Sequence, residues 1–302
     1  MPAYIGVVGF GEVGATFSNA LAERGGRILV YDALLSESGG REVIRSRIQS
    51  DRISVHPLEE VVAQSEYILS TVPTHVAREV AQTCVPYLRP GRFYVDLNST
   101  SPAVKVEIGQ IIEPSRAHFV EGAILGAVGA TGAKTRLLIA GEKGKKVAEA
   151  LCGLGLNASF YSPDIGKPSA FKMLRSIFSK GLEALLLEMM VAGKRAGIAQ
   201  DLWTDIAEFM TDNPFDRVAA NWIQTHAVAC ERRYYEMVQV IETMREIKVE
   251  PVMTFATKVF FERSLSLDFD ETFEQKPKDW ETVVDFMEAQ LAEPGPSSIL
   301  LR

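Results

Sequence analysis

Short runs of β-branched and other apolar residues alternate, through the first half of the chain, with longer segments in which apolar residues recur every three or four positions. The short runs predict strands and the longer segments predict helices. The predicted strands are Tyr4–Val8, Arg27–Tyr31, Tyr67–Val72, Phe93–Leu97, His118–Ala123 and Leu137–Ala140. The predicted helices between them are Val13–Arg24, Val76–Tyr87, Pro102–Ile112 and Lys145–Leu154. Such alternation is typical of a largely parallel, doubly wound α/β sheet.

The second half of the chain continues with helical periodicity and without strand signals. Its predicted helices are Ser169–Ala196, Leu202–Met210, Arg217–Cys230, Tyr234–Arg245 and Trp280–Leu291. Glycine, which turns favour and helix interiors disfavour, is concentrated in the first half: 18 of the 23 glycines lie in residues 1–163 and 5 in residues 164–302. Two prolines and a glycine interrupt regular structure in the segment 161–168. We therefore predict an α/β domain over residues 1–163 and an all-α domain over residues 164–302.

Composition and charge narrow the class of protein. At 47% hydrophobic and 24% charged residues, the chain has the composition of a soluble globular protein. The net charge of −7 gives no electrostatic reason to bind nucleic acid or an anionic membrane. The most apolar stretch, Leu182–Ala192, is too short to span a bilayer, and the N-terminal residues lack the order of a signal peptide. Cys84, Cys152 and Cys230 are far apart, which favours a reducing compartment, so we expect a cytoplasmic protein.

A glycine-rich loop follows the first predicted strand and opens the first predicted helix. It reads Gly9-Phe10-Gly11-Glu12-Val13-Gly14, a G-x-G-x-x-G. In this setting the first glycine permits a tight turn, the second lets the backbone approach a pyrophosphate, and the third lets the helix pack closely on the strand. The N–H groups at the helix start then face the phosphates. These six residues predict a Rossmann-type dinucleotide-binding domain; the alternative is a plain strand–turn–helix corner without a ligand.

An acidic residue ends the second predicted strand. Asp32 lies 18 residues after Gly14, where a carboxylate can accept hydrogen bonds from an adenosine ribose. The same charge would repel a 2′-phosphate, so the sequence favours NAD over NADP. Arg41, Arg45 and Arg47 are near enough in sequence to neutralise a 2′-phosphate, so NADP stays possible. A role for Asp32 as a strand-end cap is the alternative.

Three further segments carry recognisable residue patterns. Asp96-Leu97-Asn98-Ser99-Thr100-Ser101-Pro102 combines an acid, small hydroxyl residues and a proline. Glu121-Gly122-Ala123-Ile124-Leu125-Gly126-Ala127 ends the fifth predicted strand, and Gly166 precedes Lys172 at the domain junction. Together with the glycine loop, these segments resemble the β-hydroxyacid dehydrogenase family, which includes 6-phosphogluconate and 3-hydroxyisobutyrate dehydrogenases. The resemblance covers residues 4 to about 195.

The resemblance implies roles for individual residues. Lys172 stands at the position of the family's catalytic lysine, which acts as a base. Asn98, Ser99 and Gly126 fall in the substrate segments. Val72 and Pro73 lie by resemblance against the nicotinamide-side ribose, although an ordinary strand end is equally consistent with them. Asn98 is also a candidate for cofactor binding. The residues implied in substrate binding also include Arg175 and Ser176, which follow Lys172 on the same helix.

The sequence also departs from the family pattern. Asn98 stands where the family commonly has a serine that touches the substrate carboxylate, and Leu125-Gly126-Ala127 replaces S-G-G. Pro168 replaces the second glycine of the lysine motif, and Ser176 stands where an asparagine is usual. Dehydrogenase chemistry is compatible with these changes, but they leave the identity of the substrate open.

The helix that carries the lysine has a polar stripe. Lys172, Ser176, Ser179 and Glu183 are spaced by four, three and four residues, which places them on one helical face. A solvated face is one interpretation. The other is a catalytic Lys172: a lysine partly desolvated in a cleft can have its pKa lowered enough to take the proton from a substrate hydroxyl. Arg175 is then a candidate anion anchor, or a member of a surface salt bridge.

We therefore expect an NAD(P)-dependent dehydrogenase of a small hydroxy acid or sugar acid. The alternatives are an enzyme that reduces C=N bonds, like imine reductases, and a non-catalytic cofactor-binding scaffold. The four histidines are scattered and no metal-ligand spacing is present, so we expect no metal. We also predict a homodimer, because apolar residues lie on more than one side of the Ser169–Ala196 helix. These residues are Leu182, Leu185, Leu186, Leu187, Met189 and Met190.

Overall fold

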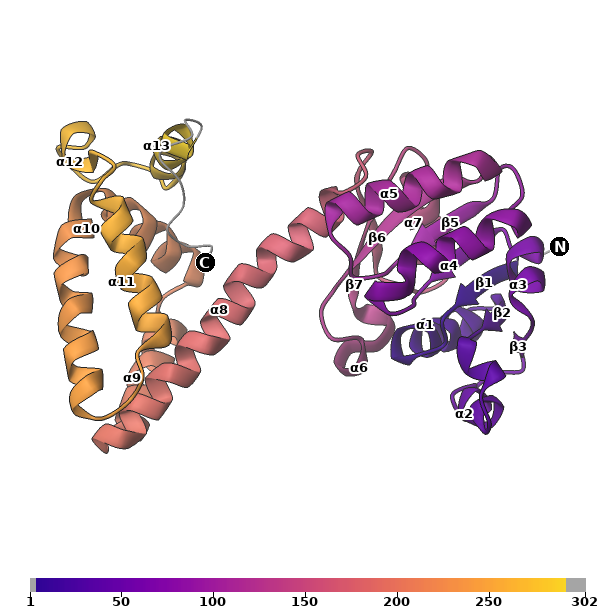
Figure 1. Ribbon diagram of the computed structural model, residues 1–302, viewed down its shortest axis with the longest axis horizontal. Helices are drawn as coiled ribbons and strands as arrows, with labels where there is room; N and C mark the ends of the chain where they lie inside the picture. The colour runs from indigo at the N-terminus through magenta and orange to yellow at the C-terminus, as the bar shows by residue number, and fades with distance from the viewer. Residues whose placement is uncertain (1–3, 292–302) are drawn as a thin grey trace. The chain divides into compact units, whose positions relative to one another are not determined.

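A computed structural model describes residues 4–291 of the chain. They form two compact units, of which one ends at Ile177 and the other begins at Phe178 (Figure 1). The boundary lies within the long helix α8, Lys167–Ala196, past the junction predicted at residues 163 and 164. The first turns of α8 belong to the first unit because they are hydrogen-bonded to its sheet, as described below.

The first unit is built on one sheet. Within the described residues eight strands pair in the order β3-β2-β1-β4-β5-β6-β7-β8, and every pair is parallel except β6 with β7. The first six strands have the order of a doubly wound dinucleotide-binding fold. The strands are β1 Tyr4–Val8, β2 Arg27–Tyr31, β3 Ile53–Val55, β4 Tyr67–Ser70, β5 Phe93–Asp96, β6 His118–Leu125, β7 Arg136–Ala140 and β8 Ala158–Ser162.

Helices cover both faces of this sheet (Figure 1). The α-helices of the unit, before α8, are α1 Glu12–Glu23, α2 Gly40–Ser46, α3 Leu58–Gln64, α4 Ala77–Cys84, α5 Pro102–Ile112, α6 Val128–Thr131 and α7 Gly144–Gly153. Short 3₁₀ helices are η1 Ala33–Ser36, η2 Thr74–Val76, η3 Val85–Tyr87, η4 Glu113–Ser115 and η5 Gly132–Lys134. The predicted α/β class is confirmed.

Two hydrophobic clusters lie on the two faces of the sheet. Val7 and Val8 are adjacent on β1 and belong to different clusters, because successive strand residues point to opposite faces. One cluster includes residues of α1 and α7, and the other includes residues of α3, α4 and α5. Burial on both faces requires nearly continuous apolar strands, which is why the strand runs stand out in the sequence.

Within its described residues the second unit contains helices and no strands, which confirms the predicted all-α class. Its elements, after the C-terminal part of α8, are α9 Ala199–Asp212, α10 Phe215–Glu246, α11 Val252–Ser264, α12 Phe269–Thr272 and α13 Glu281–Leu291. Its buried core contains Ala227, Cys230, Phe269 and Val283. The prediction of two helices, Arg217–Cys230 and Tyr234–Arg245, was wrong: α10 is continuous, because Glu231, Arg232 and Arg233 are good helix formers and do not interrupt it. Between residues 4 and 291, no helix combines the length and the hydrophobicity of a transmembrane segment.

Candidate active site

The glycine loop lies between the end of β1 and the start of α1. Gly9 has φ +93°, and a Cβ added there would lie 2.7 Å from the carbonyl oxygen of Thr71. A Cβ added to Gly14 would lie 2.0 Å from the carbonyl oxygen of Gly9. At Gly11, by contrast, an added Cβ would meet no atom within 4 Å. The packing of the chain therefore explains why residues 9 and 14 are glycines, but it does not explain Gly11. The open space beside Gly11, at a helix N-terminus, fits a pyrophosphate.

Asp32 connects the end of β2 to the glycine loop. Its Oδ2 accepts a hydrogen bond from the N–H of Phe10 at 2.6 Å, and its Oδ1 accepts one from Leu34 at 2.9 Å. A carboxylate has about four lone-pair sites, so these bonds leave capacity for ribose hydroxyls. Arg47 donates from Nη1 to the carbonyl oxygen of Phe10 at 2.7 Å, while the side chains of Arg41 and Arg45 on α2 are exposed.

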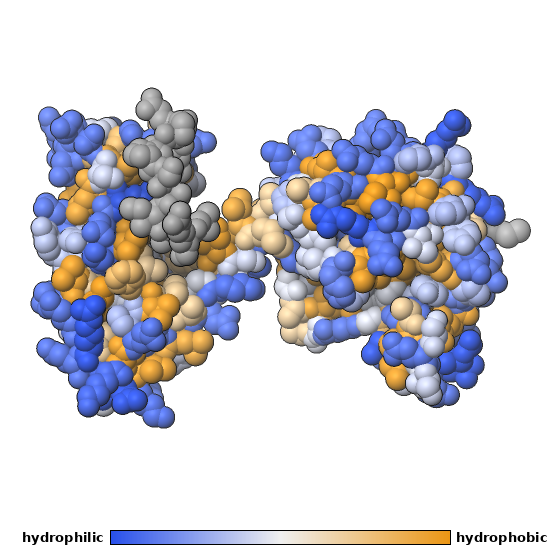
Figure 2. Space-filling view, in the orientation of Figure 1, coloured by the Kyte–Doolittle hydropathy of each residue, from blue (hydrophilic) through white to orange (hydrophobic). Residues whose placement is uncertain are grey.

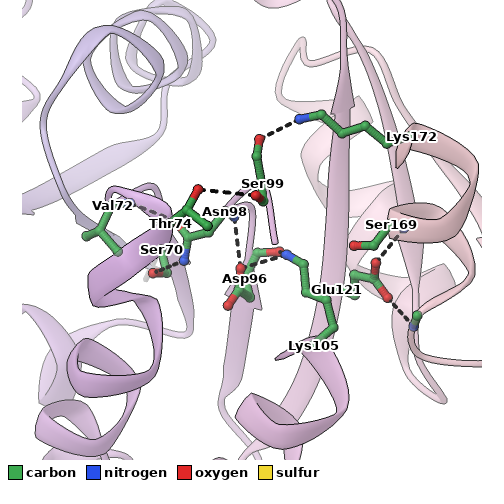
Figure 3. Close-up of polar contacts among 11 residues, drawn as sticks. Ser70, Val72, Thr74, Asp96, Asn98, Ser99, Lys105, Glu121, Ser169 and Lys172 are labelled. Atoms are coloured by element: carbon green, nitrogen blue, oxygen red, sulfur yellow. Dashed lines mark hydrogen bonds and ion pairs between the residues drawn. The ribbon is translucent and has the colours of Figure 1, made fainter. Parts of the chain in front are cut away.

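The loops after β4 and β5 are joined through Asn98 (Figure 3). Its Oδ1 accepts from the N–H of Val72 at 2.7 Å, and its Nδ2 donates to Ser70 Oγ at 3.0 Å. Asn98 is only 4% exposed. The structure therefore places Val72, Pro73 and Asn98 together, but much of the hydrogen-bonding capacity of Asn98 serves to connect the two loops. Ser99 is the next residue of the same loop.

A buried ion pair lies beneath this loop, and sequence reasoning missed it. Lys105 Nζ donates to Asp96 Oδ1 at 2.7 Å and to the Asp96 carbonyl oxygen at 2.9 Å, and both side chains are 0% exposed. Asp96 Oδ1 also accepts from the N–H of Asn98 at 2.8 Å. A signal was available, because Lys105 continues the buried stripe of Ile108 and Ile112 on α5 at spacings of three and four.

Glu121, on β6, contacts the beginning of α8. It is 0% exposed, and its two carboxylate oxygens accept hydrogen bonds from the N–H groups of Gly166 and Ser169. The first N–H groups of a helix have no partner within the helix and carry partial positive charge, so a carboxylate there is stabilising. The resemblance identified the segment of Glu121 but not this contact.

Lys172 lies one turn after Ser169 on α8. Its Nζ donates to Ser99 Oγ at 2.5 Å (Figure 3). Ser99 also accepts, through its carbonyl oxygen, a hydrogen bond from Thr74 Oγ1 at 3.1 Å. The structure thus brings two of the predicted site residues, Lys172 and Ser99, into direct contact at the carboxyl edge of the sheet, where the glycine loop also lies.

The other predicted substrate residues have different surroundings. Ser176 Oγ donates to the carbonyl oxygen of Lys172 at 3.1 Å, a bond within the helix, and the side chain of Arg175 is exposed. Gly126 is exposed at the end of β6 with φ +141°, a conformation that favours glycine. Among residues 4–291, no group of three or more His, Cys, Asp or Glu side chains is arranged to hold a metal ion.

Comparisons with known proteins give a consistent result. Residues 4–155 match the family described as the NAD binding domain of 6-phosphogluconate dehydrogenase. This match confirms the predicted dinucleotide-binding domain and its cofactor. Residues 194–264 match a domain of unknown function, DUF1932.

Relatives match over most of the chain. An uncharacterised 28.5 kDa protein from Methanothermus fervidus is 26% identical over 85% of this chain and 97% of its own. A conserved protein of unknown function, described as structurally similar to 3-hydroxyacid dehydrogenases, is 30% identical, with a TM-score of 0.59 over 86% of this chain and 96% of its own. An imine reductase from Myxococcus stipitatus, solved with NAD+, has a TM-score of 0.74 over 95% of this chain and 100% of its own. At 17% identity, the last similarity concerns the fold alone.

Proposed function

The chain belongs to the family that shares the NAD binding domain of 6-phosphogluconate dehydrogenase, and from this membership we propose that it transfers a hydride between NAD(P) and a small hydroxy acid or sugar acid. Lys172 is the general acid and base of this reaction. The observation that carries the proposal is the hydrogen bond from Lys172 Nζ to Ser99 Oγ, at the edge of the sheet where the cofactor loop lies.

The cofactor, when bound, supplies the hydride acceptor or donor. The chain supplies the binding groups. The segment Gly9–Gly14, which includes Phe10, Glu12 and Val13, binds the pyrophosphate. Asp32 binds the adenosine ribose, and Val72 with Pro73 binds the nicotinamide-side ribose. The negative charge of Asp32 disfavours a 2′-phosphate, so NAD is the preferred cofactor.

Lys172 accepts the proton of the substrate in one direction and returns it in the other. In the oxidative direction, the substrate hydroxyl gives its proton to the neutral amine of Lys172 as the hydride leaves the carbon that bears this hydroxyl. In the reductive direction, the ammonium of Lys172 returns the proton to the carbonyl oxygen. The positive charge also stabilises the oxyanion that develops at that oxygen. Ser99 Oγ, already a partner of Nζ, orients the amine, and in this proposal it contacts the same substrate oxygen. Asn98 keeps the Ser99 loop in place, and Gly126, Arg175 and Ser176 are the further substrate contacts.

The reduction of C=N bonds on the same fold is the second candidate, because an imine reductase shares this fold over almost the whole chain. Lys172 favours the first candidate, since oxidation of a hydroxyl group needs a base. A screen distinguishes them: hydroxy acids, sugar acids and phosphorylated sugar acids with NAD and NADP, against cyclic imines with NADH and NADPH. Turnover of an acid supports our proposal. Turnover of imines alone contradicts it, and cofactor binding without any turnover supports a scaffold.

A homodimer completes the proposal. Large apolar side chains of α8 are exposed within a single chain, among them Leu174 at 65%, Ile177 at 72% and Leu187 at 63%. Figure 2 shows further hydrophobic side chains at the surface of the second unit. A second chain that covers this helix removes the cost of its exposure. The three cysteines are free thiols, which suits the cytoplasm.

A further inference from the structure

Glu121 has a feature that the proposed chemistry does not use. Its carboxylate is 0% exposed, yet it reaches from β6 to α8 and accepts from the N–H groups of Gly166 and Ser169, the latter at 2.7 Å. A buried charge costs free energy unless it is fully hydrogen-bonded. Apolar residues could attach α8 to the sheet at lower cost. The contact therefore supplies something that apolar packing does not: a directional bond to two defined backbone atoms.

These two bonds determine where the next turn of α8 lies. Ser169 is three residues before Lys172, and residues three apart lie on the same face of a helix. A carboxylate that holds the N–H of Gly166 and that of Ser169 fixes both the rotation and the height of this first turn. The position of the Lys172 amine relative to Ser99 follows from that turn.

The other side of the contact is held in a similar way. Asp96 is the Cα partner of Glu121 in the parallel pairing of β5 with β6. Its Oδ1 accepts from the N–H of Asn98, the residue before Ser99, and from Lys105. Figure 3 shows the two carboxylates beneath the Lys172–Ser99 contact. Neighbouring buried carboxylates, at one level of the sheet, thus each hold one partner of this contact.

We propose that Glu121 is a positioning residue: through the first turn of α8, its carboxylate sets the distance and orientation of the Lys172 amine to Ser99. The consequence for catalysis rests on the proposed role of Lys172. The positional effect does not, and it is measurable without a substrate.

Competitive acetylation of the full chain measures it. Trace acetic anhydride labels each lysine according to the exposure and protonation of its amine, and peptide mass spectrometry gives the ratio of labelling at Lys172 to that at Lys180, an exposed residue of the same helix. Ser99→Ala provides the reference, because it removes the hydroxyl partner directly. Glu121→Asp retains the charge but shortens the side chain, so it cannot satisfy both N–H groups. Glu121→Gln retains the length but removes the charge, and its amide nitrogen cannot accept, so it too can satisfy only one of the two N–H groups.

We expect the labelling ratio to rise in Glu121→Asp as it does in Ser99→Ala, on the order of fivefold for the loss of one hydrogen bond. Glu188→Asp is the matched control: Glu188, on the part of α8 that belongs to the other unit, accepts from the N–H groups of Met253 and Thr254 at the start of α11. That variant also shortens a carboxylate that holds a helix N-terminus, and it should leave the ratio unchanged. If a Glu121 variant is too unstable, the labelling is repeated with NADH bound, since a ligand stabilises the folded state.

The outcomes separate the two proposals. An unchanged ratio in Glu121→Asp overturns the positioning role, whatever Ser99→Ala does. An unchanged ratio in Glu121→Gln overturns it as well, because that variant also leaves one of the two N–H groups without its acceptor. A rise in Glu121→Asp, combined with full turnover after the removal of the Lys172 amine, supports the positioning of Lys172 and refutes its role as acid and base.

Discussion

The Nζ of Lys172 donates to the Oγ of Ser99 at 2.5 Å, across 73 positions of the sequence. Thr74 donates to the carbonyl oxygen of the same serine at 3.1 Å. The loop after β4, the loop after β5 and the first turns of α8 therefore meet at the carboxyl edge of the sheet. In doubly wound folds ligands bind at this edge, so a lysine held here can serve the chemistry of a bound nicotinamide.

Replacement of Lys172 tests its role directly. We expect Lys172→Met to lower turnover on the order of 10²–10⁴-fold, the usual effect of the loss of a general acid or base. The affinity for NADH should stay within about twofold of the parent, because the glycine loop is unchanged. Stopped-flow or steady-state absorbance at the NADH band measures the first, and calorimetry the second.

Lys180→Met is the matched control on the same helix and should keep full turnover, since its side chain is exposed. Turnover of Lys172→Met within a few-fold of the parent would show that the lysine is not the proton-transfer group. An equal loss of NADH affinity would instead indicate damage to the fold.

Asp32 controls the choice of cofactor in our proposal. We expect NADH to bind more tightly than NADPH, and Asp32→Asn to improve NADPH binding on the order of tenfold, because a nearby carboxylate repels the 2′-phosphate. Asparagine retains an acceptor for the N–H of Phe10 or Leu34. Asp32→Ala should also reduce the preference for NADH, with some loss of stability.

Fluorescence titration with both cofactors measures the preference, and Asp51→Asn, at an exposed carboxylate, is the control. Tighter binding of NADPH to the parent would contradict the assignment.

The sequence allowed much of the fold to be predicted, and physical reasons explain what was missed. The bounds of β1, β2 and α5 match their predicted bounds, because buried parallel strands are continuously apolar and Pro102 marks a helix start. The strand β3 has only three residues, and β8 is largely exposed, so neither has a clear pattern of apolar residues.

The site was predicted only in part, because most of its contacts join segments that are distant in the sequence. The motifs identified Lys172 and Ser99, but their contact depends on how distant segments pack, and no local spacing encodes it. Glu121 and Asp96 were noticed as members of motifs, without their buried partners. Only Lys105 left a local signal, since it shares the buried face of α5 with Ile108 and Ile112.

The oligomeric state tests the interpretation of the apolar helix. We expect light scattering at micromolar concentration to give the mass of two chains. Leu187→Glu, at a side chain 63% exposed in the single chain, should shift the protein towards monomer, because a charge buried in an apolar interface is costly. Lys194→Glu, at an exposed position near the end of the same helix, should leave the dimer intact. A monomeric parent would refute the homodimer.

The second unit should lose stability in mild acid through His226. This histidine is 7% exposed, its Nε2 lies 2.9 Å from Ser264 Oγ, and its ring lies 5.4 Å from that of Phe261. Burial lowers the pKa of His226 below its ordinary value of 6.5, and the charge of Arg233 lowers it further.

The direction of the pH effect follows from this lowered pKa. Between the folded-state and the unfolded-state pKa of His226, the unfolded chain binds more protons than the folded chain. The stabilisation of the fold by neutral His226 is therefore present above about pH 6.5 and is lost as the pH falls through the folded-state pKa. We expect the Tm to fall between pH 7 and pH 5, and to fall less in His226→Gln. His75→Gln, at an exposed histidine, should behave like the parent. Equal slopes in the parent and His226→Gln, by scanning fluorimetry, would contradict the prediction.

The buried pair of Lys105 and Asp96 provides the last prediction, a double-mutant cycle. Lys105→Met leaves the carboxylate of Asp96 buried without its cation, which should cost about 3–5 kcal/mol of the free energy of unfolding. Asp96→Asn combined with Lys105→Met removes both charges and keeps an acceptor for the N–H of Asn98. The double variant should therefore be more stable than Lys105→Met alone, and urea unfolding monitored by fluorescence measures the difference.

The exposed pair of Arg78 and Glu107, in the same unit, is the control, because its side chains are 51% and 49% exposed. There Arg78→Met should cost less than about 1 kcal/mol, as solvent screens the pair. If the changes at Lys105 and Asp96 prove additive, the two groups are not energetically coupled, and the ion pair does not stabilise the loop that presents Ser99. A strong coupling, with unchanged NADH affinity in the double variant, would locate the effect in this loop and not in the cofactor site.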